Sequence, residues 1–141
     1  MTVMTARMLE EFVEAEFPQA LHMGCRVTHV DSTSIDIAMQ TQERHLRPGG
    51  TVSGPAMMEL ADFTMYLLLL AQIGPVAMAV TTNLNITFLR KPAPGNLRAH
   101  GKLLKQGKTL ATGDIQIFSG EMEEPVAQVT TTYSIPPKKP D

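Results

Sequence analysis

One segment of the chain, from Pro55 to Ile73, is apolar along almost its whole length yet contains two carboxylates, Glu59 and Asp62. Its length approaches that of a membrane span, but two acids near a bilayer centre would each cost about 2 kcal/mol or more. The pair Gly74-Pro75 that follows it is a typical helix end. The sequence therefore predicts a buried helix over 55–73 in a globular protein.

The flanking sequence predicts a shorter helix and six strands. Apolar residues at helical spacing, followed by Pro18, indicate an amphipathic helix over 5–17. Alternating patterns separated by turn residues predict two strands within 24–40 and four more at 83–88, 97–105, 110–118 and 126–135. Runs of consecutive strands favour an antiparallel sheet and an α+β class. We expect one domain over 1–135, with the sheet wrapped around the long helix, and a flexible tail over 136–141.

Composition excludes several classes of function. The net charge of −2 provides neither a basic surface for nucleic acid nor a polybasic membrane anchor. Cys25 is the single cysteine and the N-terminal segment carries acids where a signal peptide needs an apolar run, so a reducing, cytoplasmic location is expected. The four histidines show no metal-like spacing, which predicts no metal site. The absence of a Gly-x-Ser-x-Gly elbow argues against an α/β-hydrolase.

The acids of the long helix lie on one face. A helix turns about 100° per residue, so Glu59, Asp62 and Tyr66 share a narrow stripe on an otherwise apolar rod. Such a stripe can mark where the helix meets solvent or pairs with basic groups of a partner subunit. A partly buried carboxylate there is also a candidate base or nucleophile.

The start of the long helix is a second candidate feature. Ser53-Gly54-Pro55 is a typical helix start, and the free N–H groups there would polarise a carbonyl oxygen as in an oxyanion hole. Pro55 has no N–H, so Gly54 is the expected donor and Ala56 a second candidate. Gly-Pro is also common at helix starts for structural reasons alone.

Distance links the two features. Gly54 and Asp62 are roughly 12 Å apart along one helix, whereas catalytic contacts need about 3 Å. If both groups serve one reaction, they must come from different subunits. A two-fold dimer with two such helices side by side and antiparallel would supply two equivalent sites.

Two segments carry a resemblance to a known family. They are the stretch from Gly50 through Gly54 to Leu60-Ala61-Asp62, and the strand 83–90 followed by Lys-Pro-Ala-Pro-Gly. With the order of the elements, they resemble the hot-dog-fold thioesterases, in particular the phenylacetic-acid-pathway (PaaI-like) acyl-CoA thioesterases. The resemblance covers roughly residues 12–135.

The resemblance implies a fold, an assembly and roles for several residues. In such enzymes two subunits join their sheets, dimers often pair into tetramers, and the substrate lies across the subunit interface. Gly54 would polarise the thioester carbonyl, and Asp62 would be the nucleophile or the base that activates water. Thr81, with Thr82 as the fallback, would help hold the water. No cofactor is implied, since coenzyme A is part of the substrate.

Three positions depart from the family's pattern. Arg47 stands where an Asn is expected, Ser53 where a His is expected, and Pro55 replaces a second Gly. Arg47 could receive an acyl carboxylate or a coenzyme A phosphate, or be a solvated loop residue. Ser53 takes a position that contacts the thioester region in the family.

Four further residues are candidates for substrate binding. Arg90 and Lys91, at a strand end, either contact the coenzyme A phosphates or are solvated. Tyr66 lines the acyl pocket, holds the orientation of the acid, or is a core tyrosine bonded elsewhere. Met58, with the neighbouring methionines, suits a pliable acyl pocket, although methionine at helical spacing is more often core.

The resemblance favours an acyl-CoA thioesterase and leaves two alternatives. One is a non-catalytic hot-dog protein that binds acyl-CoA as a sensor or scaffold, which the missing Asn and His favour. The other is a hot-dog dehydratase, but that chemistry usually pairs a His with the acid, and no His follows His45 in the loop and helix. The acyl chain stays open.

Overall fold

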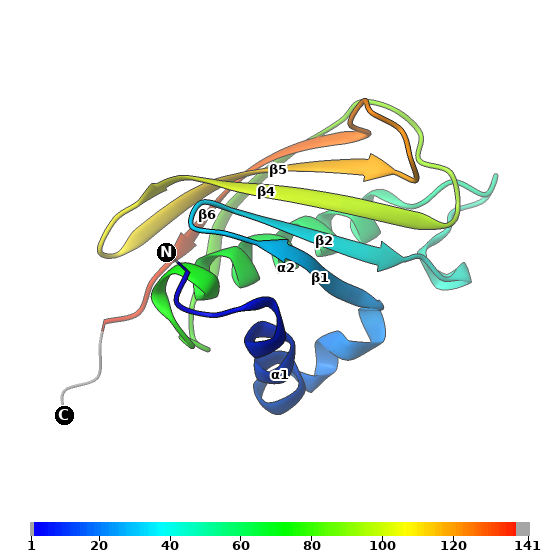
Figure 1. Ribbon diagram of the computed structural model, residues 1–141. Helices are drawn as coiled ribbons and strands as arrows, with labels where there is room; N and C mark the ends of the chain where they lie inside the picture. The colour runs from blue at the N-terminus through cyan, green and yellow to red at the C-terminus, as the bar shows by residue number, and fades with distance from the viewer. Residues whose placement is uncertain (1, 138–141) are drawn as a thin grey trace.

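A computed structural model describes residues 2–137 of the 141-residue chain. One antiparallel sheet curves around a long helix, α2, and a shorter helix, α1, lies outside that helix (Figure 1). The predicted tail lies mostly outside the described residues. The helices and strands are α1 (Ala6–Glu16), η1 (Pro18–Met23), β1 (Cys25–Val30), β2 (Ser34–Gln40), η2 (Glu43–His45), α2 (Gly54–Ile73), β3 (Val80–Phe88), β4 (Asn96–Gln106), β5 (Leu110–Ser119) and β6 (Ala127–Ser134).

The order of the strands in the sheet is β1-β2-β4-β5-β6-β3, and every pair is antiparallel. After α2 the chain therefore does not return beside β2. Instead β3 pairs with β6, which follows it in the sequence by three strands. The arrangement leaves β1 and β3 as the two edges of the sheet.

Helix α2 is the centre of the hydrophobic core. It is long and apolar enough to span a membrane, but 72% of its most apolar window is buried within the described structure. Two glycines of the sheet, Gly101 and Gly113, let it lie close: a Cβ atom on Gly113 would be 2.5 Å from Met65 Sδ. A Cβ atom on Gly101 would be 2.9 Å from Ile115 Cδ1 and 3.1 Å from Thr64 Cγ2. The helix ends as predicted, at Gly74, whose N–H donates to Leu70 O at 2.8 Å.

The N-terminal segment covers part of α2. In α1 the Thr5 hydroxyl accepts a hydrogen bond from the N–H of Met8, and Leu9 and Val13 are buried. Pro18 ends this helix as predicted. The 3₁₀ helix η1 that follows was not predicted, and it leads the chain back to β1 through Gly24, which has a φ of 71°.

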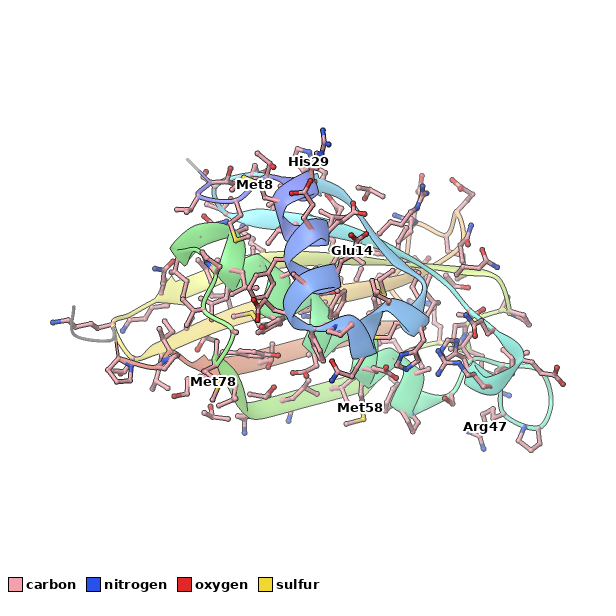
Figure 2. The ribbon with its side chains drawn as sticks, turned by 90° about the horizontal axis from the view of Figure 1, so that it is seen from below. Met8, Glu14, His29, Arg47, Met58 and Met78 are labelled. Carbon is pink, nitrogen blue, oxygen red and sulfur yellow. The ribbon has the colours of Figure 1, made fainter. Side chains whose placement is uncertain are left out.

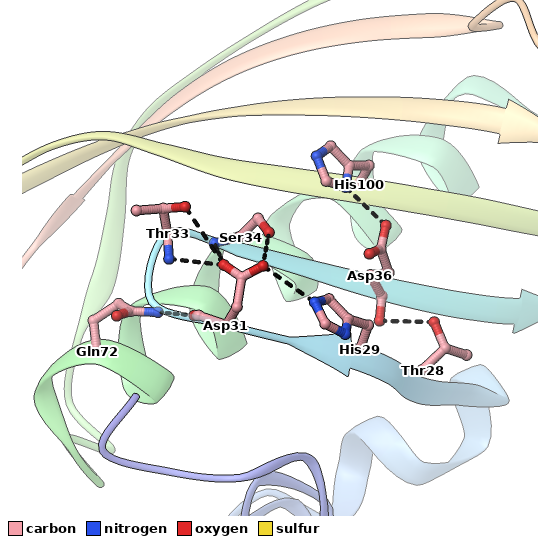
Figure 3. Close-up of polar contacts among 8 residues, drawn as sticks. All are labelled: Thr28, His29, Asp31, Thr33, Ser34, Asp36, Gln72 and His100. Atoms are coloured by element: carbon pink, nitrogen blue, oxygen red, sulfur yellow. Dashed lines mark hydrogen bonds and ion pairs between the residues drawn. The ribbon is translucent and has the colours of Figure 1, made fainter. Parts of the chain in front are cut away.

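The predicted turn at Asp31-Ser32 joins β1 to β2 and is fixed by one carboxylate (Figure 3). Asp31 accepts hydrogen bonds from the N–H groups of Thr33 and Ser34 at 2.9 and 2.8 Å, and the first of these chiefly holds the pKa of Asp31 below its usual range. The Gln72 side chain donates to Asp31 O at 2.9 Å. The hairpin is thereby tied to the C-terminal end of α2.

Candidate active site

Asp62, in the middle of α2, is held by two hydroxyl groups. Thr81 Oγ1, from β3, donates to Asp62 Oδ1 at 2.5 Å, and Tyr133 OH, from β6, lies 2.8 Å from the same oxygen and 3.0 Å from Asp62 O. The second carboxylate oxygen, Asp62 Oδ2, has no hydrogen-bond partner among residues 2–137. Burial, together with the charge of Asp62, raises the pKa of Tyr133, so its phenol stays protonated and able to donate. The carboxylate therefore has one fixed oxygen and one available oxygen.

An irregularity in β3 gives Thr81 this position. Leu84 pairs with Thr131 and packs against the core, so strict alternation would turn Thr82, not Thr81, toward the helix. A register shift between Thr81 and Asn83 inserts one residue. Such bulges re-aim side chains next to active sites. As a result Thr81 pairs with Tyr133, and both hydroxyls reach Asp62.

A cavity of about 440 Å³ opens beside Asp62, between α2 and the segment formed by the end of α1 and η1. Glu59, Asp62 and Tyr66 all line it, as their helical spacing predicts. The other lining residues come from α1, η1, α2, the loop before β3, and β6: Glu16, Phe17, Gln19, Ala20, His22, Met23, Phe63, Ala77, Ala79 and Tyr133. The volume is in the range of small-molecule sites.

Aromatic rings form much of the apolar wall. Tyr66 contacts Phe17 edge-on, with ring centroids 5.9 Å apart, and lies 6.2 Å from the ring of Tyr133. The Tyr66 hydroxyl donates to Ala77 O at 3.1 Å and not to Asp62. Tyr66 lines the cavity but does not hold the acid. Thr81 and Tyr133 hold it, and sequence reasoning missed Tyr133.

The first turn of α2 offers one free donor. Ser53 caps the helix, and its Oγ accepts a hydrogen bond from the N–H of Ala56 at 3.3 Å. The expectation that Ala56 supplies a second donor is therefore wrong, because the cap already uses that group. Within residues 2–137 the N–H of Gly54 has no partner. A Cβ on Gly54 would lie 3.0 Å from the ring of Phe88, so glycine leaves room for this ring.

Gly54 does not line the cavity beside Asp62 of its own subunit. This separation is what the helical distance between the two residues predicts. The free N–H of Gly54 and the carboxylate of Asp62 in one chain therefore do not lie at the same cavity.

The remaining predicted residues lie outside the cavity. The hydroxyl of Thr82 donates to Thr132 O at 3.1 Å, on the other side of the strand. Arg90 donates to Pro125 O at 2.6 Å and pairs with Glu124 at 2.5 Å. Lys91 is exposed.

Figure 2 shows where two further predicted substrate-binding residues, Arg47 and Met58, lie. Arg47 lies at the tip of the loop before α2, and Met58 lies on the underside of the molecule near β3. Met58 is 41% exposed and does not line the cavity. Neither residue is among those that line the cavity beside Asp62.

Two other reactive side chains stay outside the candidate site. Burial raises the pKa of the Cys25 thiol to about 12, with Glu59 adding to the shift, so the thiol is a poor nucleophile. His45 is buried, and its Nδ1 accepts a hydrogen bond from the N–H of Gln42 at 2.9 Å. Its Nε2 has no partner among residues 2–137. The part of the chain that the structure describes contains no cluster of three potential metal ligands.

The chain is similar to known thioesterases in sequence and in structure. The profile of the Thioesterase superfamily matches residues 49–126, which include the start of α2, Asp62 and Thr81. The chain belongs to the thioesterase superfamily. The curved sheet around α2 is accordingly the hot-dog fold, as predicted.

Three individual relatives of this thioesterase-superfamily chain illustrate the likeness. A protein from Silicibacter sp. TM1040, provisionally named a thioesterase, is 48% identical, with a TM-score of 0.89 over 97% of this chain and 95% of its own. The Escherichia coli PaaI protein of the phenylacetic acid degradation operon has the same fold, with 21% identity and a TM-score of 0.78 over 94% and 96% of the two chains. A provisionally named esterase from Thermoplasma acidophilum is 28% identical over 94 residues, 67% of this chain and 70% of that protein.

Proposed function

We propose that this protein is an acyl-CoA thioesterase that hydrolyses an acyl- or aryl-acyl-CoA to the free acid and coenzyme A. The observation that carries the proposal is the Asp62 carboxylate, fixed through Oδ1 by Thr81 and Tyr133 and placed at the wall of a cavity. A carboxylate with one oxygen anchored and the other available can act on a substrate without first reorienting. The family supports the same reaction class.

In the proposed reaction Asp62 acts through Oδ2. It either removes a proton from a water molecule that attacks the thioester carbon, or attacks that carbon itself to form an anhydride that water then hydrolyses. In both routes the carbon–sulfur bond breaks and coenzyme A leaves as the thiol after gaining a proton. The carbonyl oxygen gains negative charge, which an N–H donor stabilises.

That donor is the Gly54 N–H of a second subunit. Asp62 and Gly54 are too far apart on one helix, and a two-fold axis that sets two α2 helices antiparallel would bring them together. The free edge of β3 supports such a homodimer. Five large apolar side chains on or near this strand are at least 41% exposed: Met58, Met78, Val80, Phe88 and Leu89. Joining two β3 edges would cover them and pair the open strand.

Further aspects of this proposal come from the resemblance. Two dimers would pair into a tetramer, and the enzyme would work in the cytoplasm with no cofactor. Arg47, Arg90 and Lys91 are exposed cations that remain candidates for contacts with coenzyme A phosphates. Arg90 would first have to leave Glu124.

A non-catalytic acyl-CoA-binding protein is the second candidate. It is favoured by the single free donor at the start of α2 and by Ser53, whose hydroxyl caps the helix instead of facing a substrate. In this case Asp62 would be a structural acid. Binding of acyl-CoA without turnover would distinguish this candidate.

The test is thiol release from aryl-acetyl-, short-, medium- and long-chain acyl-CoAs by the wild type and Asp62→Asn. We expect release by the wild type and a loss of at least about 100-fold in kcat for the variant. Asp36→Asn, which changes an acid on the outer face of the sheet, is the matched control and should keep its activity. Equal release by wild type and Asp62→Asn would remove Asp62 from the mechanism. No release, with binding intact, would support the second candidate.

A further inference from the structure

The cavity beside Asp62 has an acidic wall. Three carboxylates line it, from Glu16, Glu59 and Asp62, and no lysine or arginine is among its lining residues. His22 is the lining side chain that could carry positive charge. The part of the cavity wall that one chain supplies is therefore electrostatically negative.

The two glutamates are not neutralised by the described chain. Neither Glu16 nor Glu59 forms an ion pair with the residues around it. Arg44, the arginine bonded to this wall, donates to His22 O at 2.6 Å and to the Gln42 side chain at 3.1 Å. Its guanidinium is thus held behind η1 and does not line the cavity.

The rest of the wall offers little to an anion. It consists mainly of the aromatic rings of Phe17, Phe63 and Tyr66, with small apolar residues between them. Both tyrosine hydroxyls are committed, that of Tyr66 to Ala77 O and that of Tyr133 to Asp62. Gln19 and His22 are the lining side chains with an N–H that an entering carboxylate could reach, and neither is a permanent cation. Such a carboxylate would therefore lose water and face three acids with little compensation.

We propose that Glu59 and Glu16 are specificity-determining residues that exclude acyl groups ending in a carboxylate. This inference rests on the proposed function and narrows its substrate class to acyl groups without negative charge. Glu59 is central because it lies one helical turn before Asp62, on the same face. A like charge several ångströms away near a protein surface disfavours an anion by about tenfold.

The test compares two thioesters of equal chain length, glutaryl-CoA and pentanoyl-CoA, which differ in the terminal carboxylate. We expect the wild type to have a kcat/KM for pentanoyl-CoA at least about tenfold above that for glutaryl-CoA. Glu59→Gln should raise the glutaryl-to-pentanoyl ratio by about five- to tenfold, and the double variant with Glu16→Gln should raise it further. Glu59→Asp, which keeps the charge, should retain the discrimination. A ratio near one in the wild type would overturn the inference.

A matched control separates the local effect from net charge. Glu121→Gln removes the same charge in the exposed turn after β5, and its ratio should equal that of the wild type. A rise of the ratio in Glu121→Gln equal to that in Glu59→Gln would contradict a role for the cavity wall.

Failure of the proposed function can be told apart from failure of this inference. If no thioester of the acyl-CoA panel is hydrolysed, the thioesterase proposal fails, and glutaryl-CoA and pentanoyl-CoA are compared by calorimetry instead. The inference then predicts weaker binding of glutaryl-CoA than of pentanoyl-CoA by the wild type, with the gap reduced in Glu59→Gln. Equal affinities for both ligands would overturn it.

Discussion

Tyr133 and Asp62 are 71 residues apart in the sequence, yet the phenol of one lies 2.8 Å from a carboxylate oxygen of the other. The same hydroxyl also lies 3.0 Å from the backbone oxygen of Asp62. The contact joins the last strand of the sheet to the middle of the central helix. It fixes the orientation of the acid that the proposed chemistry uses.

Removing the Tyr133 hydroxyl should therefore slow the reaction more than it weakens binding. We expect Tyr133→Phe to lower kcat by about tenfold with little change in KM, because the ring stays in the wall and only the anchor of Asp62 is lost. Steady-state kinetics with the best acyl-CoA from the panel provides the measurement. A change confined to KM would show that Tyr133 contributes to substrate binding alone.

The two neighbouring threonines of β3 should behave differently. Thr81 bonds Asp62, whereas Thr82 bonds Thr132 O. Thr81→Val should lower kcat by about tenfold or more, and Thr81→Ser should restore most of it, because serine keeps the hydroxyl. Thr82→Val should have near-normal kcat. The reverse pattern, with Thr82→Val the slower enzyme, would mean that the bulge is not maintained in solution.

Mixed dimers test whether the site is shared between subunits. Asp62→Asn removes the carboxylate, and Gly54→Ala crowds the N–H with a Cβ that would lie 3.0 Å from Phe88. Each variant alone should lose at least about tenfold in kcat/KM. After the two are unfolded together and refolded at equal amounts, half of the dimers would be mixed and each would have one intact site. Activity should then recover to about a quarter of the wild-type value. No recovery, with mixing confirmed by mass spectrometry, would contradict a site made from Asp62 of one subunit and Gly54 of the other.

His45 should make stability depend on pH. Burial lowers the pKa of His45, with Arg44 and His22 acting in the same direction and Glu59 opposing them. The unfolded chain therefore takes up a proton near pH 6.5 that the folded chain does not, and stability falls as the pH decreases below that value, by up to about 1.4 kcal/mol per pH unit. Urea unfolding at pH 7.5 and 5.5, for the wild type and His45→Gln, measures this effect. The variant should lose less stability than the wild type over that interval, and an equal loss would contradict the contribution of His45.

Local patterns predicted the elements because each has a strong period. Both kinds of pattern predict buried residues, and the structure confirms the burial. The examples are the alternating Ile35, Ile37 and Met39 of β2 and the apolar segment 55–73 of α2. The order of the strands was not predicted, because the pairing of β3 with β6 depends on contacts far apart in the chain. The 3₁₀ helices were missed because they are short: one or two turns do not establish a period in the sequence.

The candidate site was predictable only in part. The shared face of Glu59 and Asp62 follows from helical geometry alone. Tyr133 was missed, although it shares the inward register of Val129 and Thr131, where a buried phenol needs a hydrogen-bond partner. The identity of that partner could not be deduced from one strand. The inward turn of Thr81 was also hidden, because a bulge breaks the alternation that would otherwise assign the faces.

Strand β3 combines Thr81 with an open edge of the sheet. If the dimer forms along that edge, the strand that helps orient the acid is also the strand that holds the assembly together. Dilution would then switch the enzyme off by separating Gly54 of one subunit from Asp62 of the other, with no change in either fold. The amount of protein in the cell, and any molecule that competes for the β3 edge, would control turnover without touching the cavity.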